Sequence, residues 1–105
     1  MREFVSSLIQ VAAELQSDVV MVVEGNERGR NAIVSKVGEL LGQIRRNEGL
    51  ETFVHRRDSG DKTTLMVGLS EHPQKLAIMK ALWVRAEKDA GRIGVRIWTK
   101  EMNGG

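Results

Sequence analysis

The stretch LETFVHRRDSGDKTTLMVGLS, residues 50–70, decides the fold that the sequence predicts. Its two outer parts, residues 50–57 and 62–70, are rich in β-branched and apolar side chains, and DSGD separates them. Aspartate, serine and glycine suit a tight turn, because they tolerate its dihedral angles and bond to nearby backbone. The stretch therefore predicts a β-hairpin.

The segments before this hairpin predict a helix, a strand and a second helix. VVMVVE, residues 19–24, is too short and too β-branched for a helix, so we expect a strand that is buried on both faces and central in its sheet. Apolar residues at helical spacing predict a helix on each side of this strand. The first stripe is Phe4, Val5, Leu8, Ile9, Ala12 and Leu15, and the second is Ile33, Val37, Leu40, Leu41 and Ile44, with a glycine C-cap near residues 47–49.

The segments after the hairpin predict one more helix and one more strand. Ser70 is expected to cap the helix, with Pro73 in its first turn and Ala90-Gly91 at its end. Its expected buried stripe is Leu76, Met79, Leu82, Trp83 and Ala86. Residues 92–100 then alternate, with Ile93, Val95 and Ile97 on one face and Arg92, Arg96, Trp98 and Lys100 on the other.

The predicted order is therefore α-β-α-β-β-α-β. Without the first helix this is βαββαβ, the ferredoxin-like split βαβ arrangement. We expect an α+β, ferredoxin-like two-layer sandwich with an extra N-terminal helix. The helices would cover one face of the sheet, and the other face would be open or paired.

Composition restricts the class of protein. The chain has 105 residues, so we expect a single domain over residues 1–105. No apolar run approaches the length of a membrane span, and the N-terminus lacks the apolar core of a signal peptide. The absence of cysteine excludes disulfides, thiolate nucleophiles and cysteine-based zinc sites. These features indicate a cytoplasmic protein that does not enter a membrane.

Catalytic and metal-binding patterns are missing from the sequence. Glu24 ends a strand, but a metal site needs several convergent carboxylates, and the later pair Asp58 and Asp61 is explained by the hairpin turn. His55 and His72 are isolated, so no acid/base pair is expected. We predict no catalytic residues, no metal, no cofactor and no enzymatic activity.

A Gly-Arg turn before the second predicted helix carries a family resemblance. The motif GRNAI, residues 29–33, follows the valine-rich strand, and residues 3–69 resemble the Alba family and the related C-terminal domain of bacterial translation initiation factor three. The resemblance implies a nucleic-acid-binding face near Arg28, Arg30 and the hairpin arginines. The chain departs from both families, because it has no strand before its first helix and adds a helix and a strand after the hairpin.

Several cations form candidate binding residues. Arg28 and Arg30 lie at a predicted helix N-terminus, where backbone N–H groups favour anions, although a plain capped turn explains the same residues. Arg56 and Arg57 are neighbours on a strand, so they point to opposite faces and only one can share the open face.

The last predicted strand carries an aromatic residue between two cations. Trp98 lies between Arg96 and Lys100 on its polar-facing side. A base-stacking platform uses this combination, and stacking contributes ~1–3 kcal/mol per base. Protein interfaces use the same combination. The sequence leaves open whether the hairpin residues Phe53 and His55 share this face.

Two functions therefore follow from the sequence. In the first, a non-enzymatic module binds another protein or a second copy of itself through the open sheet face or the last strand, as a small inhibitor or accessory protein. In the second, a small protein binds RNA or DNA. The near-balanced net charge of +2 favours the protein partner, whereas the excess of arginine over lysine favours nucleic acid. The candidate binding residues are Arg28, Arg30, Arg56, Arg57, Arg96, Trp98 and Lys100.

Overall fold

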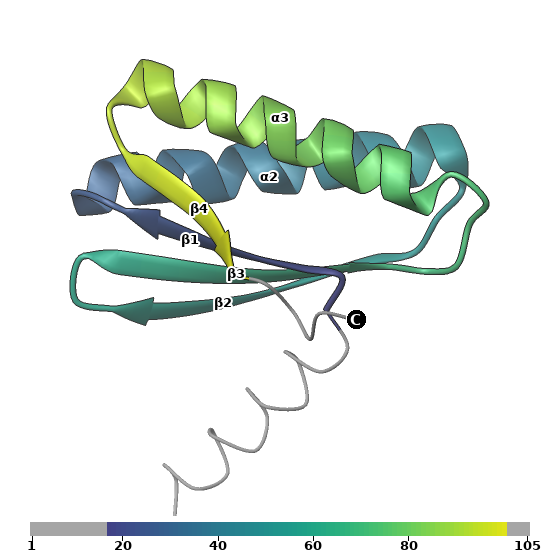
Figure 1. Ribbon diagram of the computed structural model, residues 1–105, viewed down its shortest axis with the longest axis horizontal. Coiled ribbons are helices and arrows are strands. Elements are labelled where there is room, and N and C mark those ends of the chain that lie inside the picture. The colour runs from purple at the N-terminus through teal and green to yellow at the C-terminus, as the bar shows by residue number, and fades with distance from the viewer. Residues whose placement is uncertain (1–16, 101–105) are drawn as a thin grey trace, which may run out of the picture.

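The computed structural model describes residues 17–100, and these residues form a four-stranded sheet with two helices on one of its faces (Figure 1). The elements are β1 (Val19–Glu24), α2 (Glu27–Glu48), β2 (Thr52–Ser59), β3 (Lys62–Leu69), α3 (Lys75–Ile93) and β4 (Arg96–Lys100). The sheet order is β2-β3-β1-β4, and every neighbouring pair is antiparallel. The predicted α+β class is confirmed. The predicted helix over residues 4–15 lies outside the described residues.

Strand β1 is central, as its composition predicts. It pairs with β3 on one side and β4 on the other, and Val20, Met21, Val22 and Val23 are all buried. Because side chains alternate along a strand, Met21 and Val23 face the helices whereas Val20 and Val22 face the other side. Met21 and Val23 belong to the core cluster beneath the two helices, which includes Ile33, Val37, Leu65, Val67 and Leu82.

The hairpin is confirmed, and its turn is shorter than the predicted DSGD. Strand β2 continues through Asp58 to Ser59, so only Gly60 and Asp61 connect it to β3. Gly60 has a φ of 61°, in the left-handed region that glycine adopts without strain. The Asp61 carbonyl oxygen accepts a hydrogen bond from Gly25 N–H (2.9 Å), which ties the turn to the end of β1.

Helix α2 has a well-defined cap at each end. Asn26 is its N-cap, and the Asn26 Oδ1 atom accepts a hydrogen bond from Gly29 N–H (2.7 Å). At the other end, Gly49 has a φ of 66°, and its N–H donates to the Arg45 carbonyl oxygen (3.1 Å). The predicted glycine C-cap is therefore confirmed.

The predicted start of α3 is wrong. The Ser70 hydroxyl accepts a hydrogen bond from Glu51 N–H (3.1 Å), so it holds the start of β2 and does not cap a helix. Pro73 disfavours the helical conformation at His72, and the helix begins only at Lys75. Leu76, expected in the buried stripe, is 84% exposed in this first turn.

The predicted end of α3 is also wrong. The helix continues through Gly91 to Ile93, and the left-handed Gly94 (φ 87°) ends it. A glycine inside a helix costs only about 1 kcal/mol of stability relative to alanine. The neighbouring Ala90 is buried against the core, and this packing keeps the helix intact through Gly91. Strand β4 is accordingly shorter than the predicted 92–100, and Ile93 lies on the helix.

Two glycines of α2 give a first testable prediction. A Cβ at Gly29 would come within 2.5 Å of Val95 Cγ1, whereas a Cβ at Gly38 would meet nothing within 4 Å. We expect Gly29→Ala to lower the free energy of unfolding by about 1–2 kcal/mol, because overpacking outweighs the better helix propensity. Gly38→Ala, the matched control on the same helix, should raise it by about 0.5–1 kcal/mol. Urea unfolding measures both, and losses of equal size would contradict the packing at Gly29.

Candidate partner-binding face

The register of the sheet places residues from all four strands on one face away from the helices. Directly paired residues point to the same side, and Val22 is paired with both Thr64 and Trp98. Thr64 is in turn paired with Arg57 on β2. We call this surface the second sheet face. It consists of Phe53, His55, Arg57 and Ser59 on β2, Lys62, Thr64, Met66 and Gly68 on β3, Val20, Val22 and Glu24 on β1, and Arg96, Trp98 and Lys100 on β4.

The centre of the second sheet face is apolar. Val20 and Met66 are 0% exposed, and Val22 is 4% exposed. Phe53 on β2 and Trp98 on β4 are half-buried and lie on either side of this centre. Phe53 therefore shares a face with Trp98, an alternative that the sequence left open.

The rim of the second sheet face is cationic. Four cations, Arg57, Lys62, Arg96 and Lys100, lie there with a single carboxylate, that of Glu24, so the face carries a net charge of +3. The whole chain carries only +2. The positive excess of the protein is thus concentrated on this one face.

Arg96 orients part of this rim. Its Nη1 lies 3.2 Å from Glu24 Oε1, and its guanidinium carbon lies 5.8 Å from the centre of the Trp98 ring, within cation–π range. The Arg96 side chain is still 80% exposed. Among the described residues, no hydrogen bond or ion pair engages the side chains of Arg57 or Lys62. These cations are therefore presented to solvent.

The other predicted binding residues lie elsewhere. Arg56 points to the helix side, where its Nη2 donates a hydrogen bond to Asn31 Oδ1 (2.6 Å) and its Nε to Asp58. Arg28 is exposed in the first turn of α2. The structure thus brings Arg57, Arg96, Trp98 and Lys100 together, and it separates Arg28, Arg30 and Arg56 from them.

Arg30 is buried inside the fold. It is 8% exposed, its Nε donates to the Gly25 carbonyl oxygen (3.0 Å), and its Nη1 donates to Thr63 Oγ1 (3.2 Å). The Thr63 hydroxyl in turn donates to Asp58 Oδ1 (2.6 Å). This hydrogen bond, followed by the hydrogen bond and charge of Arg56 and the charge of Arg30, holds the pKa of Asp58 below its ordinary value. The Gly-Arg turn is therefore a structural junction, and Arg30 is not available to an outside anion.

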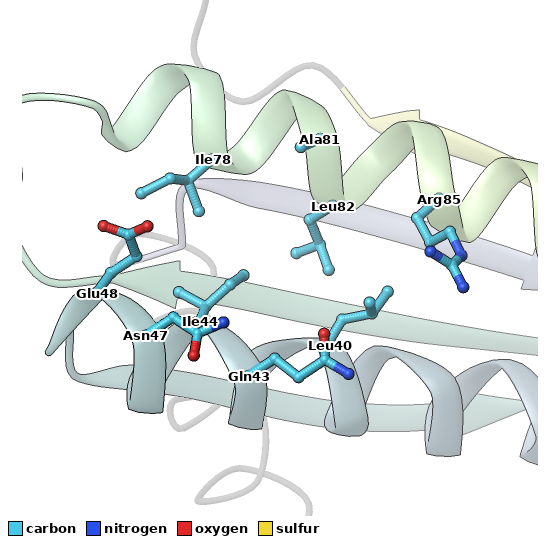
Figure 2. A pocket seen from close by; sticks show the side chains of 9 residues that line it. All are labelled: Leu40, Gln43, Ile44, Asn47, Glu48, Ile78, Ala81, Leu82 and Arg85. Carbon is cyan, nitrogen blue, oxygen red and sulfur yellow. The ribbon is translucent and has the colours of Figure 1, made fainter.

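The sequence analysis missed an apolar groove between the two helices. The groove has a volume of about 300 Å³, and Figure 2 shows its floor, with Leu40 and Ile44 of α2 facing Ile78 and Leu82 of α3. Glu48 lies at one end and Arg85 at the other. The available signal was that Leu40 and Ile44 broaden the apolar stripe of α2 beyond the side that packs on the sheet.

Neither a metal site nor a membrane span stands out among residues 17–100. No group of three or more histidine, aspartate or glutamate side chains in this range could hold a metal ion. No helix within the same range is long and apolar enough to cross a membrane.

Comparison with known proteins gives a fold likeness alone. No model of a known protein family and no curated protein matches the chain. Among solved structures, it is similar to the de novo designed protein Foldit4, with a TM-score of 0.51 and 13% identity over 79% of this chain and 92% of that one. It is also similar to the de novo designed protein Ferredog-Diesel, with a TM-score of 0.51 and 13% identity over 82% of this chain and 87% of that one. At this identity the likeness concerns the arrangement of helices and strands.

Proposed function

We propose that the protein is a non-enzymatic module that binds another protein through the second sheet face. The observation that carries the proposal is the register, which surrounds the apolar centre of Val20, Val22 and Met66 with Phe53, Trp98 and a cationic rim. Protein interfaces have this anatomy, with an apolar centre enriched in aromatic residues and arginine and a polar rim.

The chemistry of this face defines the partner. An apolar stripe flanked by acidic residues complements the half-buried Phe53 and Trp98 and the net charge of +3, which also speeds the encounter with an acidic partner. Strand β4 lies at the edge of the sheet, so strand addition by a partner or by a second copy is part of the proposal. We propose that the protein acts in the cytoplasm, for which the lack of cysteine is the supporting observation. Its proposed role there is that of a small inhibitor or accessory protein.

The finer fold class is also a proposal. We infer a ferredoxin-like sandwich, and the support for it is the order βαββαβ between β1 and β4.

RNA or DNA binding is the second candidate function, and the concentration of charge favours it. Arg57, Lys62, Arg96 and Lys100 could neutralise phosphates while Trp98 stacks on a base. The Alba-type resemblance points to the same class of ligand, although Arg30, the arginine of its motif, is engaged inside the fold.

The experiment that separates the two functions uses Trp98→Ala and Arg57→Glu, with Arg28→Ala as the control on an exposed arginine outside the face. Proteins that cross-link to the wild type would be identified and purified. We expect Trp98→Ala to lower the affinity for such a partner by about tenfold or more, as for an interfacial tryptophan. An affinity that neither face variant changes would contradict the proposal.

The same three variants are titrated with a single-stranded RNA at two salt concentrations. Four phosphate contacts predict a log–log slope of about −3 for single strands. Binding with that slope, lost in Trp98→Ala and kept in Arg28→Ala, would establish the second candidate in place of the first.

A further inference from the structure

The apolar groove between α2 and α3 opens to solvent. The residues at its rim are exposed, and they are Gln43, Asn47, Glu48, Ala81 and Arg85. On its floor, Leu40, Ile44 and Ile78 pack against the core and are only partly buried (Figure 2). Three large apolar side chains therefore keep part of their surface in contact with water at the bottom of a groove of about 300 Å³.

The groove has the length of one recognition face of a helix. It follows residues 40–48 of α2 and residues 78–85 of α3. At 1.5 Å per residue these stretches are about 12 Å and about 10 Å long. A helix that docks in a groove uses apolar anchors at i, i+3 or i+4, and i+7, which are spread over about 10 Å. The groove is therefore long enough for one such set of anchors.

The α3 side of the groove is cationic. A shallow hollow on the exposed surface of α3 adjoins the groove and shares two residues with it. The residues that line this hollow are Ala77, Lys80, Ala81, Val84, Arg85 and Lys88. Among residues 17–100, no hydrogen bond or ion pair engages Lys80 or Lys88. Arg85 Nε lies 3.9 Å from Asp89 Oδ2, beyond hydrogen-bonding distance, and the Arg85 side chain is 57% exposed. All three cations are therefore available to an anionic partner.

The α2 side of the groove has a different charge. Its rim carries the neutral amides of Gln43 and Asn47, and Glu48 lies at the end opposite Arg85. Carboxylates of an occupant are therefore attracted to the α3 side and repelled at the Glu48 end. A second copy of the chain, docked through the same helices, would bring its own α3 cations toward these ones. Charge thus favours an acidic partner over a dimer.

We propose that the groove between α2 and α3 binds an acidic amphipathic helix of a partner protein. The apolar anchors of that helix cover Leu40, Ile44 and Ile78. Its carboxylates lie along one flank, where they pair with Arg85 and Lys88. Both helices lie on one face of the sheet, so the groove and the second sheet face belong to opposite sides of the molecule (Figure 1). The inference therefore stands apart from the proposed function.

The probe for the test is a fluorescent synthetic peptide of about 18 residues, because shorter isolated helices are marginal in water. It carries leucine at i, i+3 or i+4, and i+7, and glutamate along one flank of this stripe. We expect Ala81→Glu, at the exposed rim beside the cations, to lower the affinity for this peptide about tenfold or more, because it brings like charges together. Ala32→Glu, the same substitution at an exposed position of α2 outside the groove, should leave the affinity unchanged. Fluorescence anisotropy measures both.

A second peptide, in which lysine replaces every glutamate, tests the charge of the partner. It should bind the wild type about tenfold or more weakly than the glutamate peptide does. Equal affinities for the two peptides would overturn the proposal. So would a glutamate peptide that does not bind the wild type, or equal effects of Ala81→Glu and Ala32→Glu.

Trp98→Ala separates the groove from the second sheet face and should leave the affinity for the glutamate peptide unchanged. A loss in Trp98→Ala that Ala81→Glu does not share would assign the peptide to the second sheet face and overturn the proposal. If Ala81→Glu does not fold, nuclear magnetic resonance of the wild type takes its place. The peptide should then shift the amide signals of residues 40–48 and 78–85 and not those of β2 or β4. A wild-type dimer by light scattering that Ala81→Glu dissociates would assign the groove to a second copy and overturn the proposal.

Discussion

Replacing Leu82 by alanine is expected to lower the free energy of unfolding by about 2–5 kcal/mol, the range for buried leucines. Leu82 is 3% exposed, belongs to the core cluster between the helices and the sheet, and also forms part of the groove floor. Its loss would remove apolar contacts and leave a cavity that α2 and α3 cannot close fully. Urea unfolding followed by circular dichroism measures the change.

Leu76→Ala is the control for this prediction. It is the same substitution on the same helix, but Leu76 is 84% exposed. We expect a change of no more than about 0.5 kcal/mol, as for a surface position. A loss at Leu76 as large as that at Leu82 would show that a partner or another part of the chain covers the first turn of α3.

Replacing Arg30 by alanine is expected to cost about 3 kcal/mol of stability, because two hydrogen bonds from a charged group are lost at once. The Gly25 carbonyl oxygen and the Thr63 hydroxyl would lose their donors, and Asp58 would lose a cation 3.8 Å from its Oδ1. The effect should appear as a lower unfolding midpoint in urea at an unchanged slope.

Arg28→Ala separates this structural role from a general effect of positive charge. Arg28 lies two residues away on the same helix and is exposed. Its removal should change stability by no more than about 0.5 kcal/mol. If Arg28→Ala and Arg30→Ala were equally destabilising, the buried contacts of Arg30 would not be the cause.

Short sequence patterns predicted the elements that depend only on residues close together in the chain. β1 could be recognised as central because five β-branched or long apolar side chains in a row, residues 19–23, suit a strand that is buried on both faces. The hairpin and the Gly49 cap follow from turn chemistry within a few residues. The boundaries of α3 could not be predicted in this way, because the hydroxyl of Ser70 is used by Glu51, a residue on the other side of the hairpin.

The burial of Arg30 was nevertheless predictable from the phase of α2. Ile33, Val37 and Leu41 form the buried stripe, and Arg30 precedes Ile33 by one helical turn. The Gly-Arg pair suggested an anion-binding site, whereas the helical phase of α2 directs the Arg30 side chain toward β3. The composition of the second sheet face needed the register between β1, β3 and β4, which depends on contacts between distant parts of the chain and is not written in any one segment.

The central position of β1 has a consequence for the order in which the protein is made. Val22 gains Thr64 as a neighbour once the hairpin exists, but its other neighbour, Trp98, belongs to the last strand. During synthesis, therefore, VVMVVE has one unpaired backbone edge until residues 96–100 have left the ribosome. A short β-branched strand in that state is a template for pairing with other chains. The time that the ribosome needs to complete β4 thus sets how long the nascent protein can aggregate through β1.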